Sequence, residues 1–387
     1  MLKDKNNLIF LHKFLKAIAD SIIQVFIPLF ILKQTGDVSL SLIYLAVYSV
    51  FVALNIFLFR KLIQKYSVLC IILHFIPIIT AQCLLATLDI TIWLVLGCAV
   101  TMSIAQTLYS VPINLVFAFS DSKTNVAKFQ IGTNLAKLIF ILVSGFIIST
   151  SSSSLVVLCV VSGFIYIACV IPILFAYNFL KQNYSYESKT EKVKVDKRFV
   201  VFHIAFGSFQ AVLDNCIPLF LFINHLSFQA VTVVLALVEC MKIISNYVAK
   251  WLVKIDKSRL SCIISCSIFF TSLICLITFK HPTLLYVCTC LCSISFPLTF
   301  VPMFKQYCNY LKESNNIFSG MTQRDIEIFS LRPLAYSLSF VGLGMYPSFA
   351  FGLIAMIVMF IYELKLTSEN KIENESKDSD KDIKEEV

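Results

Sequence analysis

The chain has 387 residues, of which 58% are hydrophobic and 14% are charged, and its formal net charge at pH 7 is +9. A soluble domain carries about 25% charged residues, so this chain has too little polar surface for a soluble fold and is expected to be an integral membrane protein. The sequence shows no zinc cluster, phosphate-binding loop or other catalytic constellation, and its fourteen cysteines lie almost wholly in apolar runs. We therefore predict that it is not an enzyme and needs no cofactor.

Long apolar segments run through most of the chain. A helix that spans a membrane needs about 20 apolar residues, and turns or charge clusters divide the sequence into twelve such segments. We therefore predict an all-α polytopic membrane protein with twelve transmembrane helices. The first six segments are residues 9–33, 39–59, 67–87, 92–119, 128–149 and 155–180. The other six are residues 199–223, 228–253, 260–279, 284–310, 323–343 and 349–365.

Basic residues are concentrated in alternate loops between these segments. Arg60 and Lys61 follow the second segment, and the stretch 181–198 is rich in lysine, whereas the intervening loops contain essentially only Lys33 and Lys280. Cytoplasmic loops of membrane proteins carry the excess of lysine and arginine, so we expect the first set of loops and both chain ends in the cytoplasm. The net charge of +9 is then mostly a consequence of this orientation, and no nucleic acid is expected as a partner.

The two sets of six segments resemble each other. Pro28 in "VFIPLFIL" and Pro218 in "NCIPLFLF" are 190 residues apart, and Pro112 and Pro302 have the same separation. Matches at a constant offset indicate an internal duplication. The polar stretch between the halves is the expected linker, and the charged C-terminal end, which lacks aromatic residues, is expected to be disordered. The predicted domains are an N-terminal six-helix bundle at 1–180, a cytoplasmic linker at 181–198, a C-terminal six-helix bundle at 199–366 and a tail at 367–387.

Twelve segments in two six-helix halves with a basic linker resemble the major facilitator superfamily. The resemblance covers nearly the whole chain and implies two pseudo-symmetric bundles that rock around a central site. The loop motif that the family carries after its second helix is reduced here to "FLFRKLIQKYS", which keeps the charge but lacks the glycines and the aspartate. The resemblance implies a gating role for Arg60 and Lys61.

The stretch "GMTQRDIEIFSLRPLAY" places four charged residues where the eleventh segment begins. Its Arg-acid-x6-Arg pattern is similar to an Arg-Glu-x6-Arg signature of one branch of bacterial facilitator proteins, which implies a bacterial plasma membrane. Arg332 lies about 12 Å deeper along the helix than Arg324, and we expect its partner to be Glu239. Arg324 and Asp325 are expected at the cytoplasmic mouth, either as an interfacial salt bridge or as gating residues together with Glu327.

Two polar stripes run along expected helices of the central cavity. Lys16, Asp20 and Gln24 are four residues apart on the first helix, and the seventh helix carries a stripe that includes Gly207. A polar stripe on an apolar helix is expected to face water or protein. Because burial favours the protonated carboxyl, the aspartates are candidate proton carriers, although they could instead form structural pairs. The seventh-helix stripe consists of His203, Gly207, Gln210 and Asp214.

Further charges lie inside the eighth and fifth helices. Glu239 and Lys242, three residues apart, face each other either as a self-neutralising pair or as a coupling element. Lys137 corresponds to Arg332 when the halves are aligned, and two deep cations suit either an anionic substrate or the nearby carboxylates. His12 and His74 are expected at the membrane interface. The candidate proton-coupling residues are Asp20, Asp214 and Glu239, and the candidate substrate or cavity residues are Gln24, Tyr109, Lys137, His203, Gln210, Lys242 and Arg332.

These patterns predict a proton-coupled secondary transporter of a small organic solute, acting as a monomer in the lipid bilayer. Two alternatives remain open at this point. The same fold could move an amphipathic lipid or a peptide, or the protein could be a membrane scaffold or immunity protein that transports nothing. The sequence specifies neither the substrate nor the direction of transport.

Overall fold

The computed structural model contains helices and connecting turns, with no strand among the residues that it describes. These are residues 5–119, 125–150, 154–185, 195–224, 226–255, 257–279, 281–314, 317–340 and 344–362.

The first six crossing segments are formed by eight α-helices and one short 3-10 turn. The first segment is α1 (Lys5–Ile22), η1 (Gln24–Phe26) and α2 (Ile27–Thr35), and the third is α4 (Ser67–Leu73) and α5 (Phe75–Thr87). The others are single helices: α3 (Val38–Lys65), α6 (Ile92–Phe119), α7 (Asn125–Thr150) and α8 (Ser154–Ser185).

The second six crossing segments follow the same order. The seventh is α9 (Lys197–Ala211), the π-helical turn η2 (Val212–Cys216) and α10 (Ile217–Ile223). It is followed by α11 (Phe228–Lys254), α12 (Ser258–Thr278) and α13 (Pro282–Glu313). The eleventh is α14 (Ile317–Ser330), α15 (Arg332–Ser337) and η3 (Leu338–Phe340), and the last is the helix Tyr346–Tyr362.

All twelve expected segments are helical, which confirms the predicted fold class. Ten of them are long and apolar enough by themselves to cross a membrane. The eleventh segment departs from the prediction, because it starts at Ile317 rather than at 323 and is broken at Leu331. Pro333, in the first turn of α15, has no backbone N–H to continue the helix from α14. Most of the predicted linker and the predicted tail, residues 186–194 and 367–387, lie outside the described residues.

The first and seventh segments are interrupted at corresponding depths. The 3-10 turn Gln24–Phe26 precedes Pro28, and the π-helical turn Val212–Cys216 precedes Pro218. Proline cannot donate the hydrogen bond that a continuous helix needs, and π-helical turns are frequent at functional sites. The interruptions therefore loosen the backbone next to the polar stripes on both helices.

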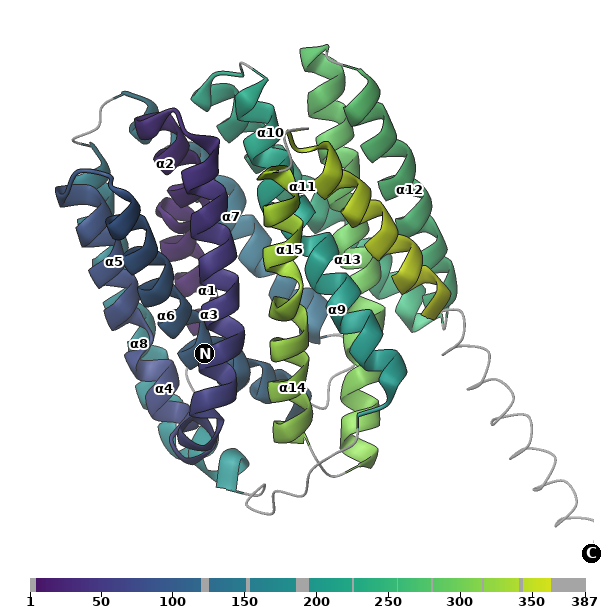
Figure 1. The fold of residues 1–387 in the computed structure, drawn as a ribbon. Helices are drawn as coiled ribbons and strands as arrows, with labels where there is room; N and C mark the ends of the chain where they lie inside the picture. Colours follow the sequence, from purple (N-terminus) through teal and green to yellow (C-terminus); the bar gives the residue numbers. More distant parts are fainter. Residues whose placement is uncertain are drawn as a thin grey trace, which may run out of the picture.

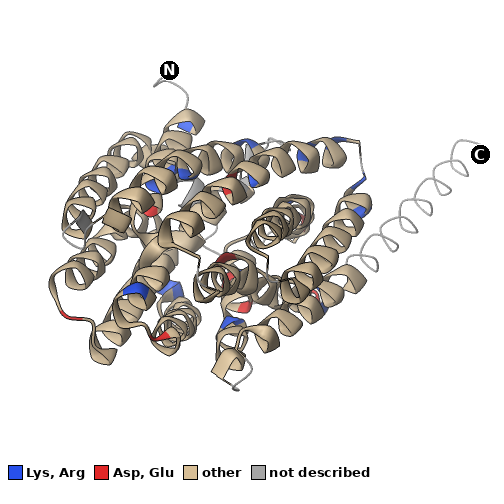
Figure 2. Cartoon of the chain, turned by 90° about the horizontal axis from the view of Figure 1, so that it is seen from above, with Lys and Arg blue, Asp and Glu red and all other residues tan. Residues whose placement is uncertain are grey.

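The two halves lie side by side and contact each other along a few helix pairs (Figure 1). Within the halves, α1 packs on α7 and α8, and α13 packs on α11 and α12. Between them, α7 packs on α11, α3 packs on α14 and α15, and α2 approaches α10. Viewed from above, most of the ribbon is uncharged, and several charged residues lie on helices in the interior (Figure 2). The interior between the halves is therefore the place to look for a polar site.

Candidate functional site

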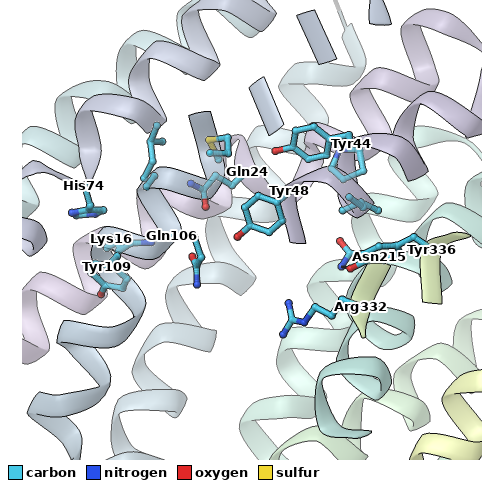
Figure 3. Close-up of a pocket in the computed structure, with 15 residues that line it drawn as sticks. Lys16, Gln24, Tyr44, Tyr48, His74, Gln106, Tyr109, Asn215, Arg332 and Tyr336 are labelled. Carbon is cyan, nitrogen blue, oxygen red and sulfur yellow. Dashed lines mark hydrogen bonds between the residues drawn. The ribbon is translucent and has the colours of Figure 1, made fainter. Parts of the chain in front are cut away.

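Two neighbouring cavities lie between the halves. The larger, of about 430 Å³, is lined mainly by α1, α7, α9, η2 and α11. The smaller, of about 190 Å³, is lined by residues of α1, α3, α6, η2 and α15. Gln24, Tyr48 and Asn215 line both, so the two cavities adjoin. Residues of both halves face this space, and Figure 3 shows the walls of the smaller cavity with their side chains directed inward.

The polar stripe of α1 forms an ion pair at the edge of both cavities. Lys16 Nζ lies 2.7 Å from Asp20 Oδ2, and the Tyr166 hydroxyl of α8 donates to Asp20 Oδ1 over 2.5 Å. Lys16 also lies 4.4 Å above the centre of the Tyr109 ring. Lys16 lines the smaller cavity and Asp20 the larger one, while Gln24 lines both. The carboxylate is therefore neutralised by a cation that belongs to the neighbouring cavity wall.

The larger cavity contains a second cluster of charges. Lys242 Nζ lies 3.3 Å from Asp214 Oδ1 and 3.1 Å from Glu239 Oε1, so one ammonium serves two carboxylates. The predicted facing of Glu239 and Lys242 is thus confirmed. With its side-chain amide oriented so that the nitrogen faces Glu239, Asn134 of α7 donates to the other carboxylate oxygen over 3.2 Å. Lys137 lines the same cavity, and no carboxylate of the described residues lies within ion-pair distance of it.

Arg332 contacts a different partner from the one predicted. Its Nη2 donates to Gln210 Oε1, and its guanidinium carbon lies 4.2 Å from the centre of the Phe329 ring. Glu239 is instead engaged with Lys242, so the predicted Arg332–Glu239 pair is wrong. The break before α15 displaces Arg332 from the continuous helix on which that pairing was based. Gln210, a residue of the predicted seventh-helix stripe, supplies the contact.

The other charges of the eleventh segment form a polar layer on α14. Arg324 Nη1 lies 2.8 Å from Asp325 Oδ1, which also accepts from Asn114 Nδ2 of α6 over 3.3 Å. The predicted salt bridge between Arg324 and Asp325 is thus confirmed, and both residues are buried, with exposures of only 6% and 3%. Asn114 of α6 contacts Asp325, and the rings of Phe300 and Phe304 on α13 lie beside Arg324, which removes the pair from the surface.

His203 and Glu327 join the two helices of this layer. His203 Nδ1 lies 2.8 Å from Glu327 Oε2, and Gln323 donates to the other carboxylate oxygen over 2.8 Å. His203 does not line either cavity, although it was expected there. Its stripe neighbour Gly207 also faces α14, since a Cβ on Gly207 would lie 1.9 Å from the carbonyl oxygen of Ile328. The lower part of the stripe therefore holds α9 against α14.

Several other predicted positions have different outcomes. Tyr109 lines the smaller cavity, as expected. Arg60 and Lys61 are exposed in the last turns of α3 and form no ion pair with the described residues of α14. His12 and His74 are fully buried beside Tyr109, and their expected position at the membrane interface stays a prediction.

The sequence reading missed neutral polar residues of the site. Tyr48, Gln106 and Asn215 line the smaller cavity, and Tyr166 holds Asp20. Asn215 donates to the Tyr336 hydroxyl over 3.0 Å, which fixes η2 against α15. Tyrosines and amides within apolar segments could have been identified as candidates. Tyrosine is common in this chain, however, so the sequence offered no way of choosing among them.

The family model described as "Major Facilitator Superfamily" matches residues 9–323. A bacterial homologue of the iron transporter ferroportin in an outward-facing state is similar in structure, with a TM-score of 0.68, 13% identity, and coverage of 94% of this chain and 100% of that chain. The fucose:proton symporter of E. coli is also similar in structure, with a TM-score of 0.64 and 13% sequence identity. The match covers 92% of this chain and 97% of that chain. Identities this low support the shared fold alone. A comparison with curated protein sequences found no match.

Proposed function

The chain belongs to the Major Facilitator Superfamily, and from this premise we propose that it couples the movement of a small organic solute to that of protons. Membership of the family and the fold support secondary active transport of a small solute. The observation that carries the proposal is the polar space between the halves, where carboxylates and lysines from both halves line adjoining cavities. Sites at this position are used for alternating access, in which the halves rock around a bound substrate.

Three carboxylates are suited to carry the protons: Asp20, Asp214 and Glu239. Each contacts a lysine, and protonation of a carboxylate removes the charge that holds this lysine. Proton binding thereby changes the interactions across the cavity. Asp20 is contacted by Lys16 on α1 and Tyr166 on α8, and Lys137 of α7 lines the same cavity.

The helices that carry two of these carboxylates are those that are interrupted. Asp20 precedes η1, and Asp214 lies within η2. A change in charge at these positions acts on the backbone segments with the fewest regular helical hydrogen bonds. We propose that α2 and α10 move relative to α1 and α9 when the carboxylates gain or lose protons. Lys242 and Lys137 are the cations whose interactions with these carboxylates then change.

The polar character of the cavities argues against the two alternatives. A site for an amphipathic lipid needs an extended apolar surface, whereas Lys137, Asp214 and Lys242 line the larger cavity. A scaffold protein has no need of buried, unneutralised charge between two halves, because such charge is costly. A small polar solute fits better than either.

The metal cargo named for the similar ferroportin homologue is not part of this proposal. Asp20, Asp214 and Glu239 are each engaged by a lysine, which repels a metal cation at the same position. Among the described residues, no group of three or more histidine, cysteine and acidic side chains could hold a metal ion.

The finer predictions from the sequence remain proposals. We propose a monomer in the plasma membrane of a bacterium, with both termini in the cytoplasm and the domains divided at 181–198. We also retain the Arg-acid-x6-Arg branch signature and a gating role for the α14 layer of Arg324, Asp325 and Glu327, since these side chains connect α14 to α6 and α9. Arg60 and Lys61 are proposed to act at the cytoplasmic surface in another conformation.

The proposal is tested with the purified chain reconstituted into liposomes. The liposomes are incubated in an extract of small metabolites, with and without an imposed pH gradient, and their contents are identified by mass spectrometry. We expect at least one solute to accumulate above its external concentration only when the gradient and the protein are both present. Equal contents in protein-containing and protein-free liposomes would contradict transport, and accumulation that ignores the gradient would contradict proton coupling.

A further inference from the structure

The smaller cavity differs from the larger one in the sign of its charge. Lys16 and Arg332 line it on opposite walls, and its described lining contains no aspartate or glutamate (Figure 3). The larger cavity is lined by three carboxylates and two lysines. The larger cavity is therefore rich in carboxylates, and the adjoining smaller cavity is lined by cationic side chains without a carboxylate among its described lining residues.

Arg332 is held in place by groups that leave its charge uncompensated. Gln210 accepts a hydrogen bond from Nη2, the Phe329 ring lies 4.2 Å from the guanidinium carbon, and Nε has no hydrogen-bond partner among the described residues. No carboxylate of the described residues lies within ion-pair distance. By contrast, Arg324 on the preceding helix has Asp325 at 2.8 Å. Asp214 and Asp325 are near enough to interact with Arg332 electrostatically but form no ion pair with it, so the guanidinium can still pair directly with an anion that is not part of the protein.

Lys16 supplies a second cation on the facing wall. Its Nζ contacts Asp20, which lines the other cavity, so this ammonium lies between the two spaces. An anion in the smaller cavity and the carboxylate of Asp20 therefore compete for the same lysine. A proton on Asp20 would resolve this competition in favour of the anion, because it removes one of the two negative charges.

We propose that the smaller cavity binds a small organic anion that carries a carboxylate, with Arg332 as its anchor and Lys16 on the opposite side. This inference rests on the proposed function and names the substrate class of the same site. Arginine matches a carboxylate with two parallel hydrogen bonds, which a lysine does not reproduce. Tyr48, Tyr109, Gln106 and Asn215 surround the space between, and their rings, hydroxyls and amides suit a solute body that is a ring or a polyhydroxylated chain.

The size of the cavity limits the solute. Its volume of about 190 Å³ is below the roughly 300 Å³ at which pockets for drug-sized ligands begin. The space around Lys16 and Arg332 accordingly suits a small metabolite, although it adjoins the larger cavity. Since Lys16 and Arg332 belong to different halves, an anion that contacts both changes the relative free energies of the arrangements of the halves.

Binding is tested without transport, by thermal unfolding of the full chain in detergent at pH 7. The probes are two pairs matched in shape and different in charge: benzoate with benzamide, and glucuronate with glucose. We expect at least one carboxylate to raise the unfolding midpoint and its neutral partner to leave the midpoint unchanged. The proposal is overturned if neither carboxylate has an effect, or if the neutral compounds stabilise the protein as strongly.

Three variants and a control locate the site. Arg332→Gln is expected to weaken carboxylate binding about tenfold or more, and Arg332→Lys to restore it only in part. Lys16→Gln combined with Asp20→Asn removes the second cation without leaving a lone carboxylate, and is also expected to weaken binding. The control Arg259→Gln removes an exposed arginine outside the cavities and should bind as the unmodified chain does. Full carboxylate binding in Arg332→Gln would overturn the assignment.

The two proposals can fail separately. If the unmodified chain binds a carboxylate but accumulates no solute in liposomes, the anion site stands and the proposed transport does not. If it accumulates only neutral solutes and binds neither carboxylate, transport stands and the anion site is wrong.

Discussion

At the scale of single residues, the buried charges of the molecule fall into two groups. Lys16, Lys242 and Arg324 each have a carboxylate within 3.3 Å, whereas Arg332 contacts an amide and an aromatic ring. Removing one partner of a buried pair typically costs about 3–5 kcal/mol, because the remaining charge is uncompensated. Loss of a partner from one of these pairs should therefore destabilise the fold, whereas Arg332 has no carboxylate partner to lose among the described residues.

A comparison of double variants tests this division. Lys242→Gln and Glu239→Gln should be coupled by about 0.5–3 kcal/mol, because the two side chains are in contact, while Arg332→Gln and Glu239→Gln should add within about 0.5 kcal/mol. The free energy of unfolding is measured in mixed detergent micelles. Strong coupling of Arg332 to Glu239, without coupling of Lys242 to Glu239, would show that the predicted pair exists after all.

Of the two partners predicted for Glu239, Lys242 is confirmed and Arg332 is wrong, and this difference shows which contacts a sequence can specify. The contact with Lys242 was predictable, since residues three apart on one helix are neighbours. The partner of Arg332 lies on another helix, and spacing along one helix gives no information on the rotation or depth of the next. Here the helix is also broken at Leu331, directly before Arg332, and the partner is Gln210.

At the scale of the helices, the close approach of α9 to α14 brings the polar stripe of α9 against the charged residues of the eleventh segment. Gly207 permits this approach, because any side chain there would meet the Ile328 backbone. Small residues allow membrane helices to pack at short distance. His203 and Gln210, one turn to either side, then reach Glu327 and Arg332.

Gly207→Ala should therefore destabilise the protein by about 1–3 kcal/mol, as overpacking in a fixed core does. Gly97→Ala is the matched control, because a Cβ at that position of α6 has nothing within 4 Å. Thermal unfolding of the two variants in one detergent gives the comparison. If Gly207→Ala unfolds at the same temperature as Gly97→Ala, the two helices are not fixed at this distance.

The helices themselves were largely predictable from the sequence, and their interruptions were not. Expected and observed segments agree within a few residues because length and hydropathy determine which stretches can cross a membrane. Pro28, Pro218 and Pro333 were visible as possible bends, but proline is also tolerated in continuous helices such as α6 and α13. Only the packing of the neighbouring helices decides where the backbone departs from regularity.

At the scale of the whole molecule, the orientation in the membrane follows from the basic loops. Reporter fusions after Lys65 and Ser314 should be active on the cytoplasmic side, and a fusion after Thr35 on the outside. Lys65 is the last residue of α3, Ser314 directly follows α13, and Thr35 is the last residue of α2. A fusion at any of these points therefore leaves the helices uninterrupted. Activity of the Thr35 fusion in the cytoplasm would reverse the proposed topology.

The central claim is that carboxylates in the cavity couple protons to the solute, and gradient-driven accumulation in liposomes tests it most directly. The measurement compares the unmodified chain with Asp20→Asn and Asp214→Asn, using the solute identified from the metabolite extract. The account predicts that the variants exchange labelled solute across the membrane at equal concentrations but do not accumulate it when a pH gradient is imposed. Normal accumulation by both variants would contradict the account, because neither carboxylate would then carry the coupling proton.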